Sequence, residues 1–291
     1  MNNTSFLKER WHIVVALILL LVVLFATGVF LIQISDDMEL PELFIQREDN
    51  VEKSVYLVGI SDTDFPPLLI YDEDIPTGFD IDLIQWIANE IGIQVAFVQI
   101  PWKIIFDALR NEEIDMIMSG VSITPERKEE FLFSDPYLSV EQTIAVAKDS
   151  PLTLRDFYTG ERIIGVEEGT TSEDIVHSLL IYAGITDPSK VHAVEGIAQG
   201  ASDLVDGKLD FIVADQPIMA ALAQEYPLMI ISSFFTGEEY GIVFRKDSIS
   251  LQQTINTGLR TLFQSSDWNN ITSKYLIDWR EFNEGKTLLS H

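Results

Sequence analysis

The chain of 291 residues contains no cysteine. Disulfides, thiolate metal sites, a cysteine nucleophile and a lipid attached through cysteine are therefore excluded. Basic residues are also scarce, since 19 lysines and arginines stand against 46 aspartates and glutamates, for a formal net charge of −27. A nucleic-acid-binding protein needs a basic surface, so we expect no nucleic-acid partner. The acidic excess fits either a solvated surface that aids solubility or the attraction of cationic solutes.

Motifs with known catalytic or metal chemistry are missing as well. The four histidines have no metal-ligand spacing, and no HExxH, GxSxG or P-loop sequence occurs. We therefore expect no metal and no cofactor. The chain does have an ordinary globular composition, with 47% hydrophobic and 22% charged residues. That composition excludes wholesale disorder and allows either one large domain or two lobes with a buried core.

One long apolar segment lies near the N-terminus. Residues 13–32 carry no charge, and a helix of this length spans the roughly 30 Å hydrocarbon core of a membrane. Lys8 and Arg10 precede it and acidic residues follow it, which predicts a cytoplasmic N-terminus and an exported remainder. Ala26-Thr27-Gly28 would also suit cleavage of a signal peptide. The length of the run favours an uncleaved single-pass anchor in residues 1–35, and both hypotheses place the rest outside the cytoplasm.

Beyond a polar linker at 36–53, short β-rich runs alternate with helical stretches. This alternation predicts an α/β fold with largely parallel sheets. In the first expected helix, Asp80 is a candidate N-cap and Gly92 a stop signal. The expected strands are 54–60, 95–100, 114–118, 162–166, 190–194 and 209–213, and the expected helices are 80–91, 103–110, 172–184 and 217–225.

Two segments of the chain resemble each other. DALRNEEIDMIMSG (107–120) and SDLVDGKLDFIVAD (202–215) align without gaps, and each has the pattern of a helix end, a tight turn and a strand. The alignment predicts two similar α/β lobes, with Gly120 and Asp215 at equivalent strand ends. Because ligands of open α/β sheets bind beyond the carboxyl ends of strands, we expect a site between the lobes.

One helix start could hold a carboxylate. Thr124 and Pro125 are suited to begin a helix, which places Arg127 in its first turn, near the strand end at Gly120. A guanidinium group can donate to both oxygens of a carboxylate. The alternative is a surface arginine paired with Glu130, which would contribute little.

Other candidate residues have equally plain structural alternatives. Thr170 and Glu173 have the spacing of a capping box, and the amides there could also hold an anion. Asp215 could pair with an ammonium group or cap the next helix. Phe65 and Trp102 follow expected strands, where an aromatic ring covers either a ligand or only the edge of the sheet.

Taken together, these segments resemble a known family. The matching stretches are DFPPL (64–68), GFDIDL (78–83), GVSITPERKEEFLFSDPY (120–137), IGVEEGTTSED (164–174), LVDGKLDFIVAD (204–215) and YGIVF (240–244). Residues 55 to about 278 thus resemble the amino-acid-type solute-binding proteins of ABC transporters, bacterial extracellular solute-binding protein family 3, with the type II periplasmic binding protein fold. The resemblance implies a two-lobed clamp at 54–283, with lobe 1 at about 54–138 and 242–283, lobe 2 at about 139–241, and a tail at 284–291.

The resemblance also implies a set of ligand-binding residues. In the family, the residue at Arg127 grips the ligand α-carboxylate with help from Ser122 and the threonine amides, and the residue at Asp215 takes the α-ammonium group with the carbonyl of Gly120. The two aromatic residues sandwich the ligand side chain. The implied residues are Asp62, Phe65, Trp102, Gly120, Ser122, Arg127, Glu167, Thr170, Thr171 and Asp215.

Two acidic positions bear on ligand selectivity, and a third bears on the fold. Asp62 and Glu167 stand where the family contacts the ligand side chain, which favours lysine, arginine or ornithine. The alternative is that Glu167 points to solvent. Glu112 stands where the family commonly has glycine, which suggests a changed local turn.

The implied function is that of a membrane-tethered, extracytoplasmic binding protein, expected to be a monomer and not an enzyme. It would capture a polar or basic L-amino acid for an ABC transporter permease. The alternatives are an enzyme on the same fold, such as a cyclohexadienyl dehydratase that uses Glu167 as its catalytic carboxylate, or a ligand-sensing receptor subunit. The Arg127 and Asp215 pair favours simple binding.

Overall fold

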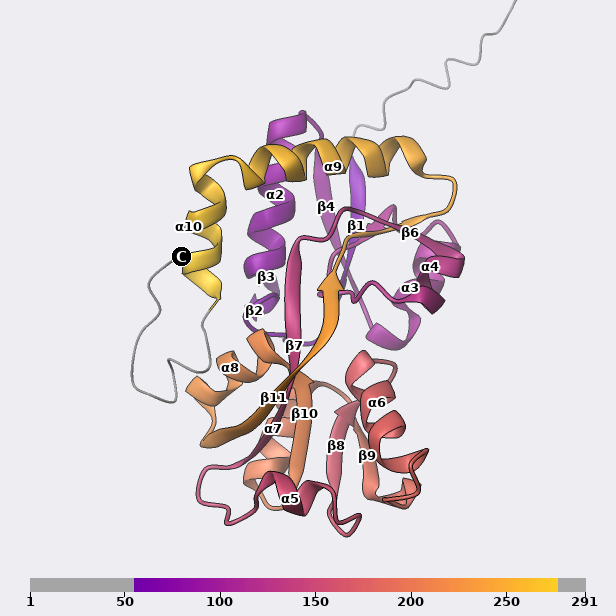
Figure 1. Ribbon diagram of the computed structural model, residues 1–291. Coiled ribbons are helices and arrows are strands. Elements are labelled where there is room, and N and C mark those ends of the chain that lie inside the picture. The colour runs from indigo at the N-terminus through magenta and orange to yellow at the C-terminus, as the bar shows by residue number, and fades with distance from the viewer. Residues whose placement is uncertain (1–54, 277–291) are drawn as a thin grey trace, which may run out of the picture. The chain divides into compact units, whose positions relative to one another are not determined.

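The computed structural model describes residues 55–276, so the apolar run at 13–32 lies outside the described residues. Within 55–276, no helix combines the length and the apolar character needed to cross a bilayer. This part of the chain forms two five-stranded sheets with helices packed against them (Figure 1). The expected α/β architecture is therefore confirmed.

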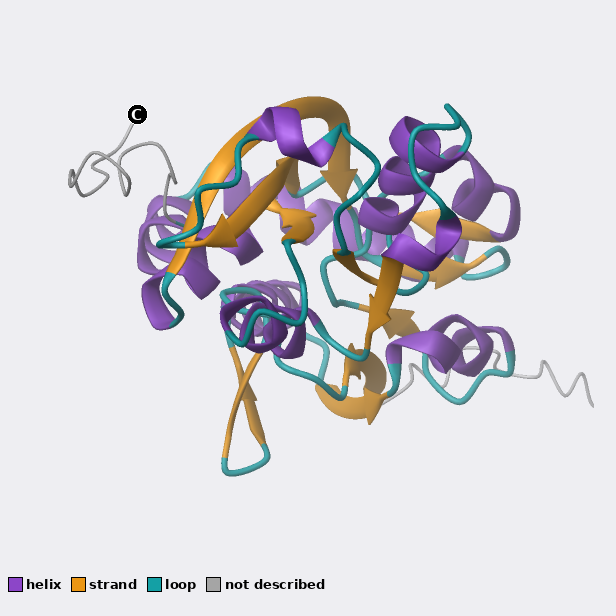
Figure 2. Ribbon diagram, turned by 90° about the horizontal axis from the view of Figure 1, so that it is seen from below, coloured by secondary structure: helices purple, strands orange, loops and turns teal. Residues whose placement is uncertain are grey.

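The first sheet has the strand order β4-β1-β5-β12-β6. Its strands β4, β1 and β5 are parallel, whereas β12 is antiparallel to both β5 and β6. A hairpin, β2–β3, projects beside it (Figure 2). The elements of this first unit are β1 (Tyr56–Ser61), β2 (Ile70–Asp72), β3 (Ile75–Thr77), α2 (Phe79–Ile91), β4 (Val95–Ile100), α3 (Trp102–Arg110), β5 (Met116–Ile117), α4 (Pro125–Glu130), β6 (Phe131–Phe133), β12 (Val243–Arg245), α9 (Ile249–Phe263) and α10 (Ser266–Tyr275).

The second sheet has the strand order β11-β7-β10-β8-β9. Here β10, β8 and β9 are parallel, and β7 is antiparallel to both β10 and β11. The elements of this second unit are β7 (Leu138–Ala147), α5 (Leu154–Phe157), β8 (Ile164–Glu167), α6 (Thr171–Val176), the π-helical turn η1 (His177–Ile181), the 3₁₀ turn η2 (Pro188–Lys190), β9 (Val191–Val194), α7 (Ile197–Val205), β10 (Phe211–Asp215), α8 (Gln216–Glu225) and β11 (Leu228–Tyr240).

Two long strands, β7 and β11, lead from one unit to the other (Figure 1). They pair along their length, and β11 contains two bulges, the second between Phe235 and Glu238. At the end nearer the first sheet, Tyr137 N donates to Tyr240 O at 2.9 Å. The bulges let a strand of thirteen residues pair with one of ten.

Local sequence signals account for most element boundaries. Gly92 ends α2 in the left-handed conformation, as expected, because glycine adopts a positive φ without steric cost. The expected helix at 172–184 is wrong in detail, because the α-helix ends at Val176 and a π-helical turn follows it. The Asp80 cap is also wrong: Gly78 occupies the N-cap position, and the Asp80 side chain is fully buried.

Candidate functional site

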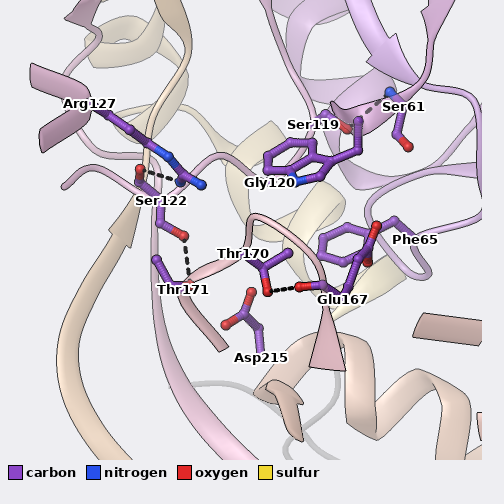
Figure 3. Close-up of a pocket in the computed structure, with 11 residues that line it drawn as sticks. Ser61, Phe65, Ser119, Gly120, Ser122, Arg127, Glu167, Thr170, Thr171 and Asp215 are labelled. Atoms are coloured by element: carbon purple, nitrogen blue, oxygen red, sulfur yellow. Dashed lines mark hydrogen bonds between the residues drawn. The ribbon is translucent and has the colours of Figure 1, made fainter. Parts of the chain in front are cut away.

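A cavity lies where the carboxyl ends of the parallel strands of both sheets meet (Figure 3). It brings together nine of the ten predicted site residues; Asp62 is the exception. Two serines that were not predicted, Ser61 and Ser119, complete the lining. The lining residues are Ser61, Phe65, Trp102, Ser119, Gly120, Ser122, Arg127, Glu167, Thr170, Thr171 and Asp215.

The floor of the cavity on the first unit depends on Gly120. Its φ is +57°, and a Cβ there would lie 2.8 Å from Cε1 of Phe65 and 2.9 Å from Cδ1 of Leu68. No side chain fits, so the aromatic ring packs directly on the peptide. The Gly120 N–H donates to Asp80 at 2.8 Å, and Tyr137 donates to the same carboxylate at 3.1 Å. Burial raises the pKa of Asp80 to about 7.

Arg127 enters the cavity from α4. Thr124 caps this helix by accepting from Arg127 N at 3.2 Å, as the sequence predicts. The guanidinium group donates to the carbonyls of Ser122 at 2.9 Å and Gly169 at 3.2 Å. It also lies 5.7 Å from the ring centroid of Trp102.

The alternative partner of Arg127 is wrong. Glu130 instead pairs with Arg110 at 2.7 Å, on the exposed side of α4. Burial lowers the pKa of Arg127 below its usual value, although nearby carboxylates act in the opposite direction. The guanidinium group nevertheless remains a cation, because its ordinary pKa lies far above neutral pH.

The second unit contributes the start of α6. The hydroxyl of Thr170 accepts from Glu173 N at 3.4 Å and donates to the carbonyl of Glu167 at 2.7 Å. The reciprocal half of the expected capping box does not form, because the Glu173 carboxylate accepts from Gly169 N at 2.8 Å. Thr171, the first residue of the helix, also faces the cavity.

Asp215 ends β10 and lies 7% exposed at the cavity wall. It occupies the N-cap position of α8, yet its side chain makes no capping hydrogen bond, so capping does not explain this residue. Its carboxylate accepts from Gln142 and from the hydroxyl of Tyr240. Burial, followed by repulsion from Glu238, raises its pKa to about 8.

The two acids assigned to side-chain selectivity lie in different surroundings. Glu167 is 9% exposed and lines the cavity, so the alternative that it points to solvent is wrong. Burial raises its pKa to about 7, with a smaller contribution from Asp62. Asp62 is exposed and lines a neighbouring cavity that also contains Asp64, Asp74 and Glu195.

Three buried residues behind the cavity were not predicted from the sequence. Gln142 on β7 donates to Asp215 and, at 2.9 Å, to Glu238, and its oxygen accepts from Ser172 at 2.8 Å. Tyr240, the first residue of the YGIVF match, is fully buried. Glu238 could not be singled out from the sequence, because nothing in the sequence distinguishes it from the adjacent Glu239.

The chemistry of the lining fits a small zwitterion better than a metal ion. One cation, Arg127, and two acids, Glu167 and Asp215, face the same space with hydroxyl groups and two aromatic rings. Across residues 55–276, no group of three or more histidine, aspartate or glutamate side chains is arranged to hold a metal. A buried charged ligand requires a charged or hydrogen-bonding partner for each of its own groups, and this lining offers both signs.

Comparisons with known proteins agree with this geometry. The family model for bacterial extracellular solute-binding proteins, family 3, matches residues 57–278. A probable histidine-binding protein of Neisseria gonorrhoeae is 32% identical over 202 residues, covering 68% of this chain and 74% of that protein.

Two solved structures are also similar. An ancestral arginine-binding protein bound to arginine has a TM-score of 0.69 and 32% identity, covering 77% of this chain and 98% of that one. The ancestral amino acid-binding protein AncCDT-1, a precursor of cyclohexadienyl dehydratase, has a TM-score of 0.70 and 31% identity, covering 77% and 96%. The chain therefore belongs to the bacterial extracellular solute-binding proteins of family 3, with their mixed α/β, two-lobed fold.

Proposed function

We propose that this protein captures an amino acid outside the cytoplasm and delivers it to an ABC transporter, without chemical conversion. The observation that carries the proposal is the presence of Arg127 and Asp215 on different units of one cavity. Arg127 would bind the α-carboxylate, assisted by amides near Thr170 and Thr171. Asp215 would bind the α-ammonium group together with the carbonyl of Gly120.

The physical reason is the cost of desolvation. A zwitterion enclosed between two lobes loses its water, so both of its charges need partners of opposite sign. A ligand that contacts both lobes stabilises the closed arrangement, which makes closure a shift in population. We assign lobe 1 to about 54–138 and 242–283 and lobe 2 to about 139–241, with Phe65 and Trp102 covering the ligand side chain.

The charges around the cavity favour a ligand with a net positive charge. Arg127 and Asp215 would neutralise the two α-groups, which leaves Glu167 without a cation among the lining residues. The ammonium or guanidinium group of lysine, ornithine or arginine would pair with it, and Asp62 would add to the attraction from the neighbouring cavity. Relatives named as histidine- and arginine-binding proteins support this class of ligand.

We further propose that residues 13–32 tether the protein to the membrane as a single-pass anchor, with 36–53 as a linker and 284–291 as a tail. The uncharged run and the flanking charges support this proposal. A cleaved signal peptide is the competing hypothesis. Mass spectrometry of the native protein would distinguish the two, because cleavage removes the whole N-terminal segment.

Calorimetric titration tests the binding proposal. Residues 36–291 would be unfolded, washed and refolded to remove bound ligand, then titrated with the twenty amino acids and ornithine. We expect a basic amino acid to bind, and Arg127→Ala and Asp215→Asn each to weaken it about 30-fold or more, because each leaves a buried charge unpaired. Arg155→Ala and Asp206→Asn, which change exposed residues outside the cavity, are the matched controls.

The outcomes separate the hypotheses. Binding of a neutral or acidic amino acid would keep the transport function and reject the assignment of Glu167. Failure of every amino acid to bind would reject the proposal and favour an enzyme on this fold. Full binding by both cavity variants would show that the ligand α-groups are held elsewhere.

A further inference from the structure

A carboxylate lies buried behind the cavity without lining it. Glu238, on β11, is 9% exposed. One of its oxygens accepts from the hydroxyls of Ser122 and Thr171, each at 2.5 Å. Its other oxygen accepts from Gln142 at 2.9 Å. Hydrogen bonds to an ionised acceptor are the stronger kind, and here they are shielded from water.

The donors belong to different units. Ser122 follows β5 and forms an isolated bridge with Tyr240, while the next amide, Ile123 N, donates to Glu239 O at 2.8 Å. Glu238 belongs to β11 and lies two residues before this bridge to the first unit. Thr171 is the first residue of α6, in the second unit. The carboxylate of Glu238 thus bridges Ser122 of the first unit and Thr171 of the second.

Other contacts also join the units, but they are weaker or more exposed. Lys103 pairs with Glu168 at 2.5 Å, with side chains 64% and 51% exposed. Such a pair contributes little, because water screens it and both long side chains lose freedom. Arg127 donates to the Gly169 carbonyl at 3.2 Å. The Glu238 contacts are shorter than the Arg127 contact and, unlike the Lys103 pair, involve a buried carboxylate.

We propose that Glu238 is a latch that stabilises the closed clamp by bridging the hydroxyls of Ser122 and Thr171, which come from the two units. Glu238 is a positioning residue, since it does not line the cavity. Because each hydroxyl has one hydrogen, those of Ser122 and Thr171 are committed to this carboxylate. The ligand α-carboxylate is then left to Arg127 and backbone amides, which differs from the role that family resemblance gives the Ser122 hydroxyl.

The latch sets the ratio of closed to open molecules before any ligand arrives. A ligand that binds the closed arrangement has an apparent affinity proportional to that closed fraction. Removing the latch therefore weakens binding without touching the ligand. This inference rests on the proposed clamp function, although its first test needs no ligand.

The absence of cysteine makes that test simple. Asn89→Cys on α2 and Arg155→Cys on α5, both exposed, would carry spin labels on the two units. Pulsed electron–electron double resonance would record the distance distribution without added amino acid, for the labelled protein with native Glu238 and for its variants. Glu238→Ala should lower the closed-to-open ratio about tenfold, the loss expected for a hydrogen bond to a charged acceptor.

Two further variants separate loss of the latch from loss of folding or of an unrelated carboxylate. Thr171→Val removes the half of this bridge that reaches α6 and leaves Glu238 in place, so it should lower the ratio in the same direction even where Glu238→Ala folds poorly. Glu239→Ala is the matched control, because it removes an exposed glutamate from the neighbouring position of the strand and should leave the ratio unchanged.

An unchanged ratio in both Glu238→Ala and Thr171→Val would overturn the latch, as would a protein with native Glu238 and no closed population without ligand. A shift in the two latch variants, with none in Glu239→Ala, supports it. These distances are independent of the calorimetric result. A chain that binds no amino acid but responds to Glu238→Ala would retain the latch and lose the proposed ligand class.

Discussion

The two sheet units have the same core. In the first, β1 lies between β4 and β5; in the second, β8 lies between β9 and β10. Asp115 in the first and Asp210 in the second occupy aligned positions of the repeated segment. Each carboxylate accepts a backbone N–H, from Leu57 at 2.7 Å and from Ile163 at 2.9 Å respectively. The predicted repeat is therefore confirmed as a structural one.

The units differ where their strands end at the cavity. Aligned through the aspartate contacts, Ser61 of the first unit corresponds to Glu167 of the second, and Gly120 corresponds to Asp215. One unit thus offers neutral groups and adds Arg127 from α4, whereas the other offers two buried acids. The shared architecture provides equivalent positions, and the residues at the strand ends determine which charge each unit presents.

The two aspartate contacts should contribute unequally to the free energy of unfolding. Asp115 is 6% exposed and Asp210 is only half-buried, so an unsatisfied Leu57 amide should cost more than an unsatisfied Ile163 amide. We expect Asp115→Ala to lower the free energy of unfolding by about 3 kcal/mol and Asp210→Ala by about 1 kcal/mol. Urea unfolding would measure both, and a larger loss in Asp210→Ala would contradict the comparison.

The acids of the second unit should also make stability depend on pH. The pKa of Asp215 is about 8 in the folded chain and near its ordinary value when unfolded, so the folded state binds more protons between these values. The free energy of unfolding should therefore fall as pH rises through that window, by up to about 1.4 kcal/mol per pH unit for one group.

Asp215→Asn should flatten this slope, measured as urea midpoints at pH 5.5 and 7.5 on ligand-free protein. A residual slope is expected, because Asp80 and Glu167 have pKa values raised to about 7. A slope identical to that of the parent protein would show that Asp215 is already ionised across the range.

The smallest effect concerns a shared turn. Glu112 and Gly207 are aligned, and both have positive φ, +63° and +75°. Glu112 therefore keeps the turn conformation of its aligned glycine, with a strained side chain. We expect Glu112→Gly to raise the free energy of unfolding by about 0.5 kcal/mol and Gly207→Ala to lower it by about 1 kcal/mol. If calorimetry showed that both substitutions change the stability in the same direction, the turns at Glu112 and Gly207 would not be equivalent.

Local signals in the sequence were sufficient for much of the fold. The alternation of strand and helix patterns, the Thr124 cap and the Gly92 stop each depend on neighbouring residues, and all are confirmed. The grouping of nine predicted residues around one cavity came from the family resemblance. Spacing alone favoured the pairing of Arg127 with Glu130.

Residues whose partners lie far along the chain could not be predicted. Asp80 bonds to an amide 40 positions away, and Gln142 bonds to Glu238 across 96 positions. The sequence also could not tell Glu238 from Glu239. Which of the two faces inward depends on the strand register, and a bulge in β11 sets that register.

The aspartate contacts also give each unit one protected amide whose hydrogen exchange reports on the opening of that unit. The amides of Leu57 and Ile163 are held by side chains that come from a different strand segment of the same unit. Each amide can exchange with solvent hydrogen only when that segment separates from the central strand. Hydrogen exchange at these two positions would therefore read the opening of one unit independently of the other, in a single experiment on the unmodified chain.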